Sequence, residues 1–121
     1  MVKTHGLTHI AIAVRDLNRT LEFYKKVFGV KEYYSDSNSI QVLGPGKHDV
    51  IAFEKNRTKA GKTSGIAHFG FRLTRPEDIQ IAVKEVERAG GKVIRRGEFA
   101  PGFPFVFVQD PDGYEIEIWY E

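Results

Sequence analysis

The sequence has no cysteine among its 121 residues. Disulfide bonds, thiolate nucleophiles and Cys-type zinc sites are therefore excluded, and any bound metal has to be held by His, Asp or Glu. No apolar leader is visible at the N-terminus, so the sequence shows no secretory signal. Together these two absences favour a cytoplasmic protein.

Long apolar runs and an excess of one charge are missing as well. The longest uninterrupted apolar stretch, residues 10–14, is far shorter than the ~20 residues that cross a bilayer. Lys and Arg number 18 against 16 Asp and Glu, and this balance argues against binding to nucleic acid or to a membrane surface. Hydrophobic residues make up 41% and charged residues 28%, which is typical of a globular domain.

Two stretches of the sequence follow the same plan and indicate one internal duplication. His9 and His68 each open an apolar strand, which leads into a helical pattern that ends at glycine. Short β-branched and aromatic stretches follow in both halves. The pattern predicts an α+β fold of two βαβββ modules within one domain over residues 1–121. The modules are predicted over about residues 5–54 and 65–121, with a polar linker over about 55–64.

Both predicted helices carry end signals. Asp16 precedes apolar residues at helical spacing and Gly29 follows them, so the first helix is predicted between these two residues. Thr74 and Glu77 have the spacing of a capping box ahead of the second helix, which Gly90 ends.

Side chains alternate across a strand, so each predicted strand has two faces. In the strands that begin at His9 and His68, bulky apolar side chains share one face, and the His and small residues share the other. In the last strand, Glu115, Glu117 and Trp119 alternate with apolar residues. A curved sheet with this second face inward would enclose a cavity, and a buried carboxylate there favours a cation. From spacing alone, a metal site and ordinary hydrogen-bonded histidines both remain open.

The motifs around these residues resemble the vicinal oxygen chelate superfamily, the glyoxalase, bleomycin-resistance and extradiol-dioxygenase group. The resemblance covers nearly the whole chain. It is carried by Leu-Thr-His-Ile-Ala-Ile-Ala-Val around His9, Gly-Ile-Ala-His-Phe-Gly-Phe around His68, and Asp-Pro-Asp-Gly-Tyr-Glu-Ile-Glu-Ile around Glu117. It implies paired modules that form a curved mixed sheet, or half-barrel, around one divalent metal. The implied ligands are His9, His68 and Glu117, which suit Fe, Mn, Ni or Zn.

The resemblance implies a metal-dependent enzyme that chelates vicinal oxygens of a small-molecule substrate for lyase or isomerase chemistry. A single-domain extradiol-type dioxygenase and a non-catalytic binding protein of the bleomycin-resistance type remain as alternatives. Ala52 stands at the position that matches Glu117 in the first module, so the fourth ligand of glyoxalase I-like members is missing. The resemblance also implies a homodimer, either with modules from two chains completing each site or with each chain pairing its own modules.

Further side chains on the predicted inner face have two interpretations each. Arg72 either grips an anionic group of the substrate, or reaches solvent or pairs with Glu115 at the strand end. Glu115 is either a proton-transfer group or a rim residue. Phe105, Phe107 and Trp119 either line the substrate cavity or belong to the ordinary core.

A Gly- and Pro-rich stretch over residues 97–104 contains Phe99 and Phe103. It either covers the cavity as a lid or simply turns the chain. His5 and His48 fall outside the repeated pattern and are predicted to lie on the surface.

Overall fold

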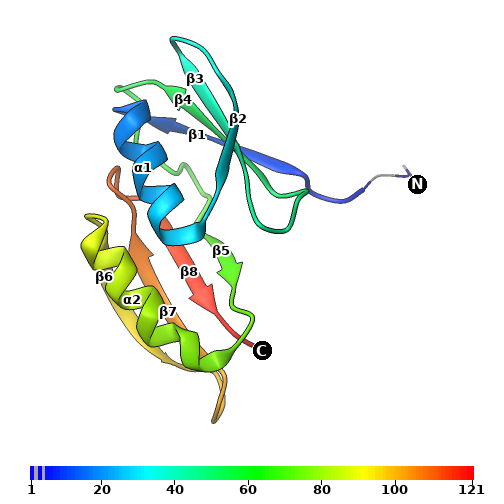
Figure 1. Ribbon diagram of the computed structural model, residues 1–121, viewed down its shortest axis with the longest axis vertical. Coiled ribbons are helices and arrows are strands. Elements are labelled where there is room, and N and C mark those ends of the chain that lie inside the picture. The colour runs from blue at the N-terminus through cyan, green and yellow to red at the C-terminus, as the bar shows by residue number, and fades with distance from the viewer. Residues whose placement is uncertain (2, 4) are drawn as a thin grey trace. The chain divides into compact units, whose positions relative to one another are not determined.

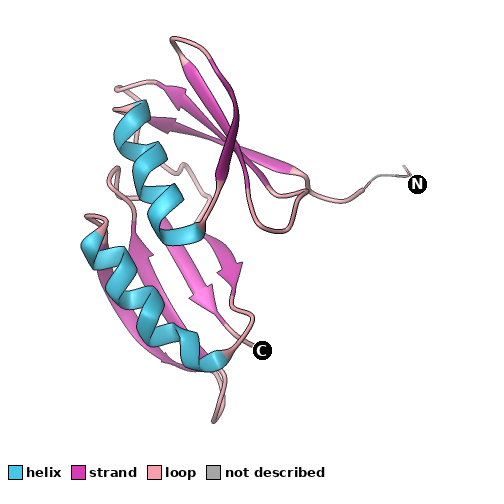
Figure 2. Cartoon of the chain, in the orientation of Figure 1, coloured by secondary structure: helices cyan, strands magenta, loops and turns pink. Residues whose placement is uncertain are grey.

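Two units of the same design make up the chain in this computed structural model, which describes residues 1, 3 and 5–121. The first unit is Met1–Ala60 and the second is Gly61–Glu121. Each unit contains one α-helix and its own four-stranded sheet. Figure 1 labels these elements, and Figure 2 separates helices from strands by colour. The predicted α+β class and the predicted βαβββ order are confirmed.

The first unit forms a mixed sheet in the order β1-β4-β3-β2. Strand β1 runs parallel to β4, and the other neighbours are antiparallel. The parallel pair is made possible by the helix that returns the chain across the sheet. Its elements are β1 (His9–Val14), α1 (Leu17–Phe28), β2 (Lys31–Ser35), β3 (Ser39–Leu43) and β4 (Val50–Lys55).

The second unit repeats this topology with the order β5-β8-β7-β6. Strand β5 runs parallel to β8, and the remaining pairs are antiparallel. A short 3₁₀ turn precedes its helix, which is the one addition to the plan of the first unit. Its elements are β5 (Phe69–Arg72), η1 (Pro76–Asp78), α2 (Ile79–Arg88), β6 (Lys92–Glu98), β7 (Pro104–Gln109) and β8 (Glu115–Trp119).

Helix α1 begins and ends as predicted. Asp16 has extended backbone angles, and its carboxylate accepts a hydrogen bond of 2.9 Å from the Arg19 amide. Gly29 closes the helix with φ of 65°, a left-handed conformation that favours glycine, while its amide donates to the Lys25 carbonyl.

Helix α2 begins differently from the prediction. The expected capping box of Thr74 and Glu77 is wrong, because Glu77 lies inside η1, which starts after Arg75, and α2 begins only at Ile79, without a side-chain cap. The Arg75 guanidinium instead binds the Asp78 carboxylate at 2.8 Å. This hydrogen bond and the charges of Asp78 and Glu77 raise the pKa of Arg75 above its ordinary value.

Each helix covers one face of its own sheet (Figure 1), and the bulky strand faces lie under it as predicted. Helix α1 buries Leu21, Phe23 and Tyr24, whereas α2 buries only Val86 to the same degree. Neither helix of the described chain reaches the length and apolarity that crossing a bilayer requires.

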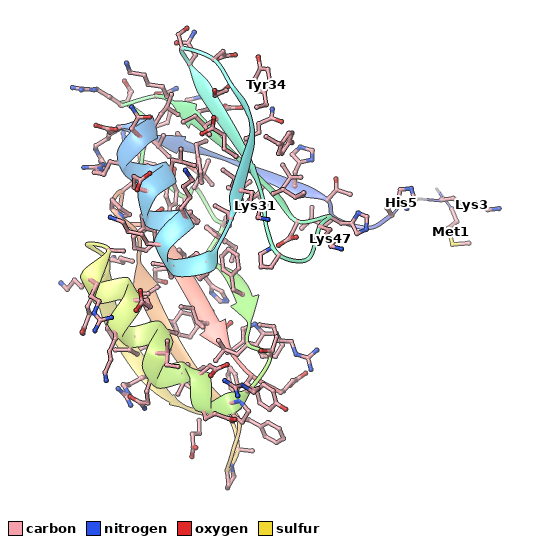
Figure 3. All side chains as sticks on the ribbon, in the orientation of Figure 1. Met1, Lys3, His5, Lys31, Tyr34 and Lys47 are labelled. Atoms are coloured by element: carbon pink, nitrogen blue, oxygen red, sulfur yellow. The ribbon has the colours of Figure 1, made fainter. Side chains whose placement is uncertain are left out.

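His5 and His48 are both exposed, as predicted. Figure 3 shows His5 on the N-terminal segment ahead of β1, and Lys47, the neighbour of His48, on the loop between β3 and β4.

Candidate metal centre

Two of the three predicted ligands, His68 and Glu117, lie together in the second unit. His68 directly precedes β5, and Glu117 is the central residue of β8, where the parallel register places it beside Gly70. The His68 Nε2 atom lies 3.3 Å from the Glu117 Oε2 atom. The Glu117 side chain is 15% exposed and that of His68 is 37% exposed, so the pair is accessible. One imidazole nitrogen and one carboxylate oxygen are a donor set that fits a divalent transition metal.

The third predicted ligand, His9, belongs to the first unit. It is the first residue of β1, is exposed, and its Nδ1 atom lies 3.4 Å from the Thr8 hydroxyl. Neither unit by itself gathers three His, Asp or Glu side chains among the residues that the structure describes. The three-ligand site therefore stays a prediction, and its second and third members are the ones seen together.

Strand pairing confirms that Ala52 is the counterpart of Glu117. In the first unit Ala52 lies beside Ala11, two residues after His9, and in the second unit Glu117 lies beside Gly70, two residues after His68. The same position of the sheet thus holds a methyl group in one unit and a carboxylate in the other. An alanine has no ligand atom, so the first unit cannot supply a carboxylate here.

Phe107 forms the apolar side of the His68–Glu117 pair. It lies opposite Glu117 on β7 and is 7% exposed. The His68 ring meets it edge-on, with 5.0 Å between centroids and an angle of 89°. The guanidinium of Arg95 lies 3.9 Å from the centroid of the same ring. A cation over an aromatic face is favourable, so Phe107 orients both the imidazole and the guanidinium.

Arg95 is a site residue that the sequence did not reveal. The register of β6 and β7 shifts between Val93, which pairs with Val108, and Arg95, which pairs with Phe107. This leaves Ile94 as an additional residue, a β-bulge. Without the bulge, simple alternation would place Ile94 opposite Phe107 and turn Arg95 toward the helix side.

The first unit has a bulge at the matching place. Between Glu32 and Tyr34 the register of β2 and β3 shifts in the same way, so Tyr34 lies opposite Gln41. The position of Arg95 could not be predicted from the sequence, because the bulge that sets it becomes visible only when both strands are paired.

Arg72 and Trp119 lie at the end of the second sheet. The Arg72 guanidinium lies 5.8 Å from the Trp119 centroid and donates a hydrogen bond to the Glu121 carbonyl. The alternative pairing of Arg72 with Glu115 is not what the structure shows, since the cation beside Glu115 is that of Arg95 at 3.9 Å.

The face of the sheet that was predicted to border a cavity is filled beside Gly70. A β-carbon at this position would lie 3.4 Å from the Trp119 Nε1 atom and 3.1 Å from the Glu117 carbonyl oxygen. The small residue therefore accommodates the indole ring and does not leave an empty cavity at this point.

The stretch predicted as a lid or a turn is a short hairpin. Strand β6 continues to Glu98 and β7 starts at Pro104, so few residues remain between the two strands. The Phe99 amide donates to the Phe103 carbonyl at 3.0 Å, and Gly102 has φ of 86°. These features describe a closed turn whose conformation its own hydrogen bonds define.

Two hollows of about 490 Å³ each lie elsewhere, and neither is lined by His68 or Glu117. The hollow in the first unit has polar walls that include Asp36. The Asp36 carboxylate accepts hydrogen bonds from the Asn38 amide and the Tyr34 hydroxyl, and both lower the pKa of Asp36. The hydrogen bond between Tyr34 and Asp36 also raises the pKa of Tyr34. The Tyr34 side chain is labelled in Figure 3.

The fold and the motifs around His9, His68 and Glu117 point to a class of proteins, and comparison with known families identifies it. The profile of the Glyoxalase/Bleomycin resistance protein/Dioxygenase superfamily matches residues 6–118. The chain belongs to this superfamily.

Individual proteins of known sequence are similar to this chain over most of its length. A probable lactoylglutathione lyase from Synechocystis is 33% identical, over 93% of this chain and 92% of that protein. Lactoylglutathione lyase GLX1 from Arabidopsis thaliana is 32% identical, and the match spans 91% of this chain but only 42% of that longer protein.

A solved structure shares the fold. A variant of the fosfomycin resistance protein FosX from Listeria monocytogenes, crystallised with Mn(II) and a dihydroxypropylphosphonic acid, has a TM-score of 0.81 and 22% identity. The match covers 96% of this chain and 90% of that chain.

Proposed function

We propose that this protein is a divalent-metal-dependent enzyme that carries out lyase or isomerase chemistry on a small substrate with two neighbouring oxygen atoms. The observation that carries the proposal is the 3.3 Å approach of His68 to Glu117. Membership of the superfamily and the names of the lactoylglutathione lyase relatives support the reaction class.

The metal would be held by His9, His68 and Glu117, one ion per site, with Fe, Mn, Ni and Zn as candidates. When bound, such a metal supplies a Lewis acid that stabilises negative charge on a substrate oxygen. The Mn(II) in the FosX variant is consistent with this choice of metals. Since Ala52 provides no fourth protein ligand, more coordination positions would be left for substrate than in a four-ligand site.

The surrounding side chains suggest distinct roles. Glu115 lies on the same strand face as Glu117, with its carboxylate 3.9 Å from Arg95, and is the proposed proton acceptor. Phe107 holds the His68 ring in one orientation. Arg72 is the second candidate for a role in the reaction: its guanidinium would bind an anionic group of the substrate. In the structure this guanidinium donates to the Glu121 carbonyl.

Metal analysis of protein purified without chelators tests the ligand set. We expect about one equivalent of divalent metal in the wild type and at least a tenfold loss of affinity in Glu117→Ala and His68→Ala. Glu115→Gln is the matched control, since this carboxylate lies on the same strand but faces Arg95. It should keep the metal and lose activity. Full metal retention by Glu117→Ala and His68→Ala would refute the ligand set.

The reaction class is tested with the adduct of methylglyoxal and glutathione, whose isomerisation is expected in the metal-loaded wild type only. Oxygen consumption with catechols in the presence of Fe(II) or Mn(II) would instead support the dioxygenase alternative. Tight ligand binding that needs neither metal nor turnover would support the binding-protein alternative.

We also propose a cytoplasmic homodimer in which modules from two chains complete each site. Mixing His9→Ala with Glu117→Ala tests this arrangement. With modules exchanged, the mixed dimer regains one intact site of two, and random pairing would restore about a quarter of the wild-type sites. If His9 serves its own chain, no site is restored. Sedimentation of the wild type then separates dimer from monomer.

A further inference from the structure

A row of three phenylalanine rings extends along the second sheet from the His68–Glu117 pair to the β6–β7 hairpin. Phe107 and Phe105 are two residues apart on β7 and share one face, with 5.8 Å between their centroids. Phe99, at the start of the hairpin, lies 4.6 Å from Phe105. We call Phe107, Phe105 and Phe99 the phenylalanine row.

Exposure rises along the phenylalanine row. Phe107 is 7% exposed beside His68, Phe105 is half-buried, and Phe99 is 58% exposed. The inner ring has its face covered by Arg95 at 3.9 Å. The accessible apolar surface is therefore the outer part, on Phe105 and Phe99.

Gly97 makes this arrangement possible. It lies opposite Phe105 in the sheet, and a β-carbon on it would come within 3.0 Å of the Phe105 Cζ atom. A side chain at position 97 would crowd the end of this ring, so glycine leaves room for the Phe105 ring in its contact with Phe99. The row is thus built into the strand sequence and does not result from a chance contact.

We propose that the phenylalanine row binds an aryl or similarly flat apolar substituent of the substrate whose oxygen atoms lie at the His68–Glu117 end. This assignment rests on the proposed function, because the row begins at the predicted metal ligands. Charged and ionisable groups gather at the Phe107 end of the phenylalanine row: Arg95, Glu115, His68 and Glu117. A narrow apolar strip with converging polar groups is typical of a small-molecule site, whereas the core of a protein interface is depleted of charge.

Two keto acids provide the probe, since phenylglyoxylate and pyruvate share a head group and differ only in phenyl against methyl. Their dissociation constants are measured by NMR titration of the whole protein in two states, metal-free and loaded with Zn(II), which is diamagnetic and therefore suits NMR. The wild type is expected to bind phenylglyoxylate about tenfold more tightly than pyruvate, from the added apolar area. Phe99→Ala should reduce this preference about threefold or more.

Phe103→Ala is the matched control. Phe103 lies on the same hairpin and is 40% exposed, but its ring stacks on Tyr120 outside the row. It should keep the wild-type preference, and circular dichroism checks that both variants fold. Equal loss in the two variants, no preference in the wild type, or no binding at millimolar concentration would overturn the proposal. So would a Phe99→Ala variant that keeps the preference but shifts the dimer equilibrium, which would assign the row to a subunit interface.

The two proposals fail separately. Metal retained by Glu117→Ala would refute the ligand set while leaving the phenyl preference of the metal-free protein intact. Metal lost as expected, together with equal affinity for the two keto acids, would refute the phenylalanine row alone.

Discussion

The two units share a backbone plan and differ on both faces of their sheets. On the helix side, the first unit packs the rings of Phe23, Tyr24 and Phe53 together, with 5.4 Å and 4.9 Å between neighbouring centroids. Helix α2 contributes a single fully buried residue, Val86. Among the fully buried side chains, the first unit therefore has aromatic rings where the second unit has only valine and isoleucine.

The sheet faces that point away from the helices differ too, and here the second unit carries the charged side chains. Three matching positions hold Ala52, Gln41 and Tyr34 in the first unit, where the second unit has Glu117, Phe107 and Arg95. Side chains on this face can change without disturbing the helix side, because a strand separates the two sets of residues. The comparison shows how one duplicated framework can carry a carboxylate and a cation at these positions in only one copy.

The largest expected effect tests the difference between the cores. Phe23→Ala should lower the free energy of unfolding by about 3–5 kcal/mol, because it removes a ring that is 1% exposed and leaves a cavity. Val86→Ala removes less volume and should cost about 2 kcal/mol. Urea unfolding measures both. Equal losses would contradict the expectation that the aromatic packing around α1 contributes more to stability than the burial of Val86 in α2.

The next prediction tests the difference between the sheet faces that point away from the helices. Ala52→Glu places a carboxylate at the counterpart of Glu117, on the strand beside the one that carries His9. If His9 ligates the proposed metal, affinity should rise about tenfold, which corresponds to about 1.4 kcal/mol. Calorimetric titration with Zn(II) measures this change.

Ala52→Gln is the neutral control of nearly equal size for this experiment. It should leave the affinity near that of the wild type. The same affinity in Ala52→Glu and Ala52→Gln would show that this position lies outside the metal site.

The smallest expected effect concerns the helix starts. Asp16→Ala removes the cap of α1 and should cost about 1 kcal/mol of unfolding free energy. Thr74→Ala should cost less than about 0.5 kcal/mol, because α2 has no side-chain cap to lose. A loss for Thr74→Ala as large as that for Asp16→Ala would mean that the predicted capping box operates in solution.

Local sequence determined the plan of both units. The strand and helix order, the cap at Asp16, the left-handed Gly29 and the bulky strand faces all follow from short-range patterns of apolar side chains and turn residues. The equivalence of Ala52 and Glu117 could also be predicted, since it needs only the offset between two repeats.

Only strand pairing decided which side chains surround Glu117. The bulge at Ile94 turns Arg95 onto Phe107, and the indole of Trp119 takes the space beside Gly70. Alternation along one strand cannot predict either result, because a bulge depends on the register with the neighbouring strand and a filled space depends on the side chain beside it. The sequence by itself therefore determined the framework, and its family resemblance predicted a ligand set. The tertiary structure decided which side chains surround His68 and Glu117.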